Sequence, residues 1–166
     1  MAYGKVLALL TGDPSDEGVL EQGVDMVQPI KGNLYAVYVI EVDRAVPVDA
    51  EVGQSAAYGE SVLRAAESRV RLPRGDFDAQ LLQARETGPA VVEEARRRRV
   101  DAVVVGTTSH YEYGRFSLTD DVMHILENAP CLVVLRREPP RHQPRRSGGQ
   151  NGTRPRAARQ SGPDGT

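Results

Sequence analysis

The sequence predicts an α/β fold: an open, five-stranded parallel sheet in the order 3-2-1-4-5, with helices packed on both faces. Short apolar runs alternate with longer segments of helical periodicity, which is the pattern of strand–helix–strand units in a parallel sheet. The 166 residues are 40% hydrophobic, which suits one domain with a sizeable core. Right-handed crossovers leave few topologies, and among them we favour the doubly wound order.

Most of the expected strands are short and rich in Val, Leu and Ile, as strands buried on both faces of a sheet are. Turn-forming residues follow the first of them, and a proline-containing loop follows the second. The five strands are expected at residues 5–11, 33–41, 77–84, 103–105 and 132–135.

Four helices are expected between these strands. Ser15 is predicted to cap the first and Thr87 the third, because hydroxyl side chains accept hydrogen bonds from the first backbone N–H groups of a helix. The second spans about residues 54–72, and the fourth opens at Thr119. Arginines 96–99 crowd the end of the third helix, where we interpret them as a solvated helix end rather than a binding patch.

A ligand of this fold is expected at the carboxyl ends of the first and fourth strands, where the strand order reverses. That topology places the loop at 11–15 beside the loop at 106–118. The second loop is long and polar, and long loops in compact domains are often functional. The question for function is whether these loops have the chemistry to hold a ligand.

Three short motifs carry a family resemblance. They are Gly-Asp-Pro-Ser at 12–15, Val-Val-Val-Gly at 103–106 and Ala-Pro-Cys at 129–131. With the spacing between the last two, they make residues 1–136 resemble a universal stress protein domain. The resemblance implies a Rossmann-like fold of the adenine nucleotide alpha hydrolase-like type, ATP binding in some members, and dimers formed by edge pairing of the last strand.

The ATP-binding pattern of that family is incomplete in this chain. Members that bind ATP carry Gly-x2-Gly-x9-Gly-Ser/Thr after the fourth strand and an acid at the end of the first. Gly106 matches the first position, but other residue types occupy the remaining three, and Thr11 stands at the position of the acid. The resemblance therefore outlines a degenerate nucleotide cleft made of Thr11, Gly12, Asp13, Val39, Gly106, Ser109, Thr119 and Asp120.

These replacements weaken phosphate binding on physical grounds. Glycines let backbone N–H groups approach phosphates and accept positive φ, which the Cβ atoms of Ser109 and Thr119 disfavour. The N-terminus of a helix attracts anions, but the carboxylates of Asp120 and Asp121 would repel a triphosphate there.

We therefore expect a non-catalytic regulatory domain with no catalytic residues, no metal and no required cofactor. The alternative is a member that holds ATP or AMP in an altered pose, with slow hydrolysis. The sequence has neither a nucleophile elbow nor histidines at metal-ligand spacing. Asp120 and Asp121 are interpreted as first-turn helix acids and Cys131 as a packing residue. Tyr111 and Tyr113 either fill the cleft or contact a partner.

Charge is distributed unevenly along the chain. Residues 1–135 carry 13 basic and 21 acidic residues, whereas residues 136–166 carry eight arginines and two acids. The tail at 137–166 has no large apolar residue, a composition typical of disorder. Three interpretations of it stay open: an inert extension, a segment that binds an acidic surface of a partner or of its own body, and a nucleic-acid binder. The last is the least favoured, because no aromatic residues alternate with the arginines.

The chain has one cysteine and no apolar run as long as a membrane helix, so we expect a cytoplasmic protein without membrane contact. The last strand leaves an apolar sheet edge that nothing later in the sequence covers, and such an edge invites pairing with a second copy. We expect a homodimer whose contact is formed by the last strand, through Cys131, Leu132, Val133, Val134 and Leu135. We also expect a protein partner of another kind.

Overall fold

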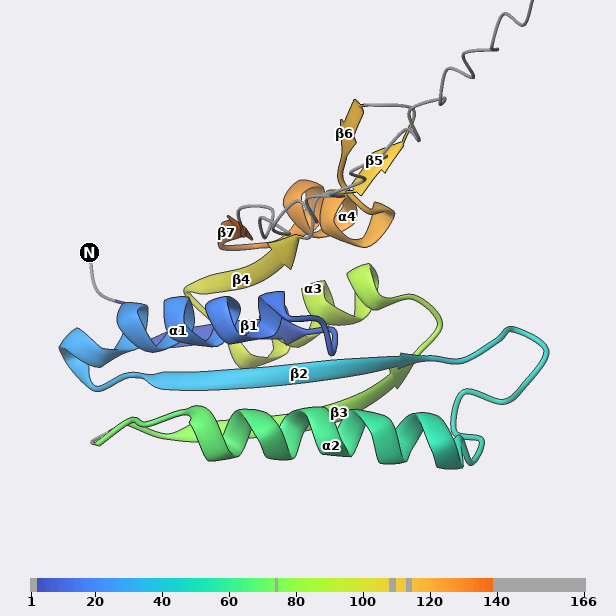
Figure 1. The fold of residues 1–166 in the computed structure, drawn as a ribbon, viewed down its shortest axis with the longest axis horizontal. Helices are drawn as coiled ribbons and strands as arrows, with labels where there is room; N and C mark the ends of the chain where they lie inside the picture. Colours follow the sequence, from blue (N-terminus) through green and yellow to red (C-terminus); the bar gives the residue numbers. More distant parts are fainter. Residues whose placement is uncertain (1–2, 74, 108–109, 113–114, 139–166) are drawn as a thin grey trace, which may run out of the picture.

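The computed structural model describes residues 3–73, 75–107, 110–112 and 115–138, and an open sheet of five parallel strands forms its centre (Figure 1). The strands run in the order β3-β2-β1-β4-β7, which confirms the predicted order with β7 as the fifth strand of the sheet. Their bounds are β1 Lys5–Leu10, β2 Asn33–Glu41, β3 Phe77–Ala84, β4 Ala102–Thr107 and β7 Leu132–Arg137.

Helices cover both faces of the sheet. Side chains of α1 (Ser15–Val27) and α2 (Gly53–Arg69) pack on one face, and those of α3 (Thr87–Arg98) and α4 (Asp120–Asn128) pack on the other. In Figure 1, β2 runs between α1 and α2, and α2 lies along β3. A short 3-10 turn, η1 (Gln28–Ile30), extends α1. Within the described ranges, no helix has both the length and the apolar character needed to cross a membrane.

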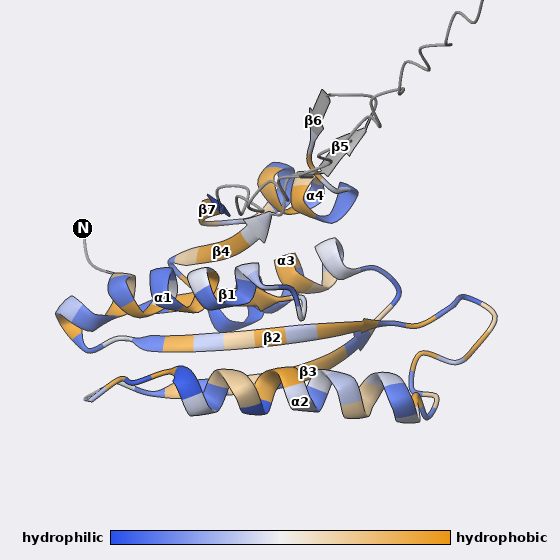
Figure 2. Cartoon of the chain, in the orientation of Figure 1, coloured by the Kyte–Doolittle hydropathy of each residue, from blue (hydrophilic) through white to orange (hydrophobic). Residues whose placement is uncertain are grey.

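The core consists of two apolar layers separated by the sheet. Along β1, Val6, Ala8 and Leu10 face the layer under α1 and α2, whereas Leu7 and Leu9 face α3 and α4. This alternation arises because successive side chains of a strand point to opposite faces. Burial on both faces explains the continuous apolar runs in the sequence, and Figure 2 shows β4 coloured as hydrophobic along most of its length.

The segment after β4 differs from the loop that was predicted. Residues His110–Glu112 (β5) and Arg115–Ser117 (β6) form a two-stranded antiparallel ribbon, in which Tyr111 is opposite Phe116. Strands of three residues are too short to show a period of two in the sequence. Ser109 and Tyr113 lie outside the described residues, and so does the side chain of Tyr111.

The ends of several elements differ from prediction. Ser15 does not cap α1; it lies buried in the first turn, after Pro14 at the N-cap. Thr87 is likewise the first residue of α3, and Glu86 holds the N-cap position. β7 continues through Arg137, one residue past the expected domain boundary. From residue 139 onward, the predicted disorder of the tail falls outside the described residues.

Candidate functional site

A cavity of about 350 Å³ opens at the carboxyl ends of β1 and β2, beside the first turns of α3 and α4. This is the edge of the sheet at which a doubly wound fold usually binds its ligand. The residues that line the cavity are Leu10, Thr11, Tyr38, Val39, Ile40, Glu41, Ser55, Thr87 and Asp121.

The predicted site residues are distributed over several places. Thr11 and Val39 line this cavity. Gly12 and Asp13 line a second cavity, of about 410 Å³, between α1 and α2. The remaining described candidates lie at the end of β4 and at the start of α4, and these are Gly106, Thr119 and Asp120.

The loop after β1 is held by the carboxylate of Asp16, in the first turn of α1. Its two oxygens accept hydrogen bonds from the backbone N–H groups of Thr11, at 2.9 Å, and Gly12, at 2.8 Å. The Thr11 hydroxyl donates at 3.3 Å to the same carboxylate and to that of Asp13. Burial raises the pKa of Asp16, and these hydrogen bonds offset part of that rise. Two backbone donors of the loop therefore bind a carboxylate of the chain itself.

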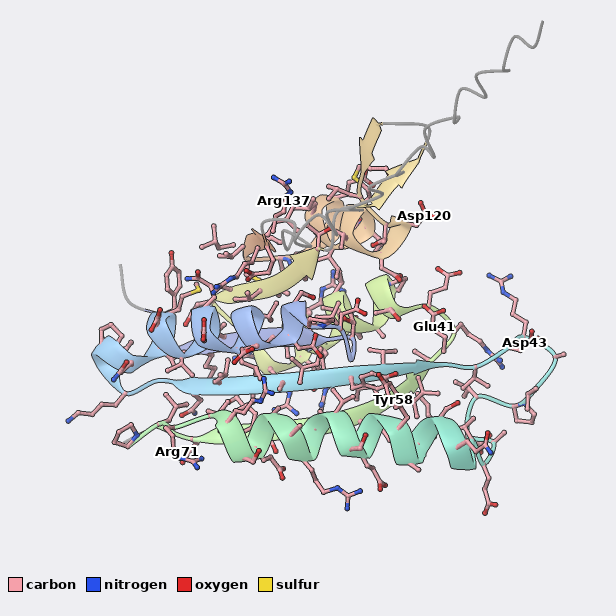
Figure 3. The ribbon with its side chains drawn as sticks, viewed as in Figure 1. Glu41, Asp43, Tyr58, Arg71, Asp120 and Arg137 are labelled. Carbon is pink, nitrogen blue, oxygen red and sulfur yellow. The ribbon has the colours of Figure 1, made fainter. Side chains whose placement is uncertain are left out.

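Tyr58, on α2, lies over the same loop. Gly12 has a φ of +82°, and a Cβ at this position would collide with the Tyr58 hydroxyl, so the loop requires glycine. Tyr38, on β2, packs edge-to-face against Tyr58 with ring centroids 6.0 Å apart. Figure 3 shows Tyr58 between α2 and β2. Burial, followed by the neighbouring Tyr58, raises the pKa of Tyr38, so the phenol is neutral at physiological pH.

The first turn of α3 is occupied by carboxylates from two other elements. Glu41, at the end of β2, accepts hydrogen bonds from the N–H and the hydroxyl of Thr87, both at 2.9 Å. The next backbone donor, Gly88, binds Oδ1 of Asp121 at 2.8 Å. Gly88 approaches α4 so closely that a Cβ there would lie 2.9 Å from the Cβ of His124. The packing of α3 on α4 thus brings Asp121 to the start of α3.

The first turn of α4 is capped by Thr119. Its hydroxyl accepts a hydrogen bond from the backbone N–H of Val122 at 3.4 Å. Asp121 lies in this turn but reaches across to α3 instead. One of the donors that a phosphate would need at this helix end therefore has a partner within the chain.

Gly106 has a packing explanation that involves no ligand. A Cβ at this position would lie 2.9 Å from Cγ2 of Val19 and 3.1 Å from the hydroxyl oxygen of Ser15. Glycine therefore lets the start of α1 pack closely on the end of β4. A match at this one position does not by itself indicate a phosphate loop.

Sequence reasoning did not single out Asp16, Glu41 or Tyr58 as site residues, and it treated Asp121 as an ordinary helix acid. The one available signal was topological, since the parallel order brings the end of β2 beside the start of α3. No local spacing reveals the contacts of Glu41, Asp121 and Tyr58, whereas Asp16 lies only four and five residues from the backbone groups that it binds. Across the described part of the chain, no three His, Cys, Asp or Glu side chains are grouped so that they could hold a metal ion.

Residues 2–137 match the model of the Universal stress protein family. The chain belongs to the universal stress protein family. The predicted resemblance is thereby confirmed over residues 2–137. Among curated protein sequences, none matches this universal stress protein.

Several solved structures share the fold of this universal stress protein. One, from Archaeoglobus fulgidus in complex with dAMP, is 15% identical with a TM-score of 0.63, and the match covers 81% of this chain and 98% of that one. A family member from Burkholderia pseudomallei is 21% identical with a TM-score of 0.60, covering 81% and 96%. One from Arabidopsis thaliana with AMP bound is 14% identical with a TM-score of 0.60, covering 86% and 96%. At these identities the similarity establishes the fold.

Proposed function

We propose that this universal stress protein is a non-catalytic, cytoplasmic regulatory protein with a degenerate nucleotide cleft, and that it acts on a protein partner as a homodimer. One observation carries the proposal: backbone N–H groups around the cavity bind the chain's own carboxylates. Asp16 binds the loop after β1, while Glu41 and Asp121 bind the first turn of α3. Loops and helix N-termini use such N–H groups to bind phosphates.

ATP would meet two separate energetic costs in this cleft. A phosphate that took one of these N–H groups would leave a carboxylate without its hydrogen bond, and a hydrogen bond to a charged group contributes roughly 1.5–3 kcal/mol. A carboxylate about 6 Å from a phosphate adds roughly 1–3 kcal/mol of repulsion at effective dielectric constants of about 20 to 60. Glu41 and Asp121 both line the cavity, so both costs apply there.

We predict that ATP binds no more tightly than about 100 μM, a free energy near −5.5 kcal/mol. Titration calorimetry in the presence of magnesium measures this affinity. Combining Glu41→Gln with Asp121→Asn removes two charges and keeps oxygen acceptors for Thr87 and Gly88. The affinity of this double variant should be about tenfold higher or more, because the repulsion is removed.

The matched control also removes two negative charges, but from positions outside the cleft. Glu67→Gln combined with Glu127→Gln changes two exposed acids, one on α2 and one on α4. This control should bind ATP as weakly as the wild type does. Micromolar binding by the wild type, or an equal gain of affinity in both double variants, would contradict the proposal.

A second candidate function is the binding of a nucleoside monophosphate in an altered pose. It is favoured by the two structures of the same fold, from Archaeoglobus fulgidus and Arabidopsis thaliana, that hold dAMP and AMP. A monophosphate carries less negative charge than ATP, so the acidic rim opposes it less. Mass spectrometry of small molecules released from purified, denatured protein distinguishes the two functions. A near-stoichiometric adenine nucleotide supports this candidate, and an empty extract supports the first.

The dimer proposal rests on β7, which pairs with β4 along one edge. Within the described residues, no strand pairs with its other edge. Leu132, at the start of β7, is 47% exposed, and Met123 and Leu126 on α4 are 42% and 41% exposed. Antiparallel pairing of two β7 strands about a twofold axis would satisfy the backbone groups of this edge and cover these apolar side chains.

A further inference from the structure

Two adjoining cavities form a groove between α1 and α2. One, of about 410 Å³, begins at the loop that contains Gly12, and the other, of about 600 Å³, lies further along α1. They share Glu17, Leu20 and Arg69, and aliphatic side chains of both helices contribute to their lining. The groove therefore follows α1 from its first turn toward its last.

The α1 wall of this groove is acidic. Glu17, Glu21 and Asp25 lie four residues apart, which places them on one face of the helix about 6 Å apart along its axis. All three are exposed and line the groove. The facing end of α2 contributes Arg69, 3.6 Å from Glu17. The segment after α2 contributes Arg71, which donates to the backbone carbonyl of Val70 (Figure 3). Carboxylates therefore outnumber guanidinium groups along this part of the groove.

The described part of the chain ends beside this acidic helix. Arg136, on β7, donates to the backbone carbonyl of Gly18 at 2.6 Å and lies 3.5 Å from the carboxylate of Glu21. Glu138 accepts a hydrogen bond from Arg136 at 2.8 Å, and its carboxylate lies against Gly18. The segment that follows thus starts next to the middle of α1.

We infer that residues 139–166 dock their arginines in the groove, on the acidic face of α1. This segment carries six arginines and one acid. Arg141 is three residues beyond Glu138, so an extended chain can carry it about 10 Å, roughly the diameter of a helix. Arg141 and Arg145 are about 13 Å apart in an extended chain, which matches the roughly 12 Å between Glu17 and Asp25.

The arginine side chain suits this groove better than a compact charged group would. Its guanidinium group binds carboxylates through paired N–H groups, and its aliphatic stem covers apolar surface such as that of the half-buried Val24. Each exposed ion pair contributes little, typically about 1 kcal/mol or less. The covalent connection at Glu138 compensates, because it keeps the segment at an effective concentration of about millimolar. Docking of this kind weakens as salt is added.

The test uses the full chain with a nitroxide spin label on the tail. Cys131→Ala removes the native thiol, and Ser147→Cys supplies the attachment point. In about 50 mM salt, the amide signals of residues 17–25 and 69–71 should lose more than half of their intensity, and they should recover in about 500 mM salt. Unchanged intensities would show an inert tail, and losses centred on α3 or α4 would show a different surface. Either outcome overturns the inference.

Two further comparisons identify the binding groups and the occupant. Glu17→Gln with Asp25→Asn should abolish the signal loss, whereas Glu67→Gln with Glu127→Gln, which neutralises two exposed acids outside the groove, should preserve it. If the amide signals still lose intensity in the Glu17→Gln and Asp25→Asn double variant, docking in the groove is contradicted. Mixing spin-labelled protein with isotope-labelled protein that lacks the spin label tests the source of the tail. A loss as strong in that mixture would show that another copy supplies the arginines, which contradicts docking within one chain.

Discussion

Glu94 and Arg98, on α3, form an ion pair that is almost completely buried. The two side chains are 7% and 14% exposed. Arg98 also donates to Asp78 on β3 at 3.1 Å, and its guanidinium carbon lies 4.4 Å from the ring centre of Tyr35 on β2. Arg97 is a second donor to Glu94, at 2.6 Å. This cluster of charges therefore joins α3 to two strands of the sheet.

We predict that Glu94→Gln lowers the free energy of unfolding by about 2–3 kcal/mol at pH 7, because Arg98 loses a charged acceptor in a buried site. Burial acts to raise the pKa of Glu94, but the hydrogen bonds and charges of Arg97 and Arg98 outweigh it and lower the pKa. A carboxyl with a lowered folded-state pKa contributes stability above its ordinary pKa of 4.5 and loses it as the pH falls through the folded value. The difference between wild type and variant should therefore shrink toward pH 3.

Urea unfolding at pH 7 and pH 3 measures that difference. Glu93→Gln provides the control on the same helix, since Glu93 and its partner Arg96 are 70% and 58% exposed. It should change stability by less than about 0.5 kcal/mol at either pH. A deficit of the Glu94 variant that is the same at both pH values would contradict the proposed ionic origin.

The arginine run at 96–99 shows how far the sequence predicts single residues. Its position at the end of a helix was predictable, and Arg96 and Arg97 are exposed as expected. The prediction of a solvated end is wrong for Arg98, which is 14% exposed. Its partners Asp78 and Tyr35 belong to strands distant in the sequence, so no local spacing indicates them.

At the scale of elements, the stability of α4 depends on its cap. We predict that Thr119→Ala lowers the free energy of unfolding by about 1 kcal/mol, because the N–H of Val122 loses its acceptor at the start of this short helix. Thr119→Ser retains the hydroxyl and should change stability by a few tenths of a kcal/mol. Thermal unfolding compares the two variants. Equal losses in both would attribute the effect to the methyl group rather than to the cap.

The main elements follow from the sequence because their periodicity reflects burial. Four strands of the large sheet contain apolar runs, whereas β3, at the edge, carries Asp78, Gln80 and Gln83 and has no buried residue. The helices bury the apolar faces that the spacing of their residues indicates. The position of the cavity also follows, since topology fixes where strand ends meet. Its hydrogen bonding does not, because packing between distant elements brings Glu41 and Asp121 to the start of α3.

At the scale of the whole molecule, we predict a homodimer at micromolar protein concentration. Leu132→Glu should raise its dissociation constant about tenfold or more, because the carboxylates would be buried at the shared edge. Ile30→Glu is the control: Ile30 is 52% exposed and lies in the turn that leads into β2, with β1 and β4 between it and β7. Deletion of residues 139–166 should leave the dimer intact.

Light scattering decides between the possible outcomes for the dimer. A monomeric wild type would contradict the proposed assembly outright. Equal dissociation of the Leu132 and Ile30 variants would show that added charge, rather than the edge of β7, controls association. Dissociation on removal of the tail would assign the contact to residues 139–166 instead of the sheet.

The aromatic pair at the cleft gives this protein an intrinsic optical probe. The chain contains six tyrosines and no tryptophan, so its near-ultraviolet absorbance and emission come from tyrosine. Tyr58 contacts the Gly12 loop and Tyr38, and the carboxylates of Asp13 and Asp16 act on the Tyr38 ring electrostatically. Tyr38 lines the cavity of about 350 Å³, so a molecule that enters this cavity should change the surroundings of its ring. Tyrosine fluorescence, compared between wild type and Tyr58→Phe, therefore reports occupancy of the cleft without an added dye.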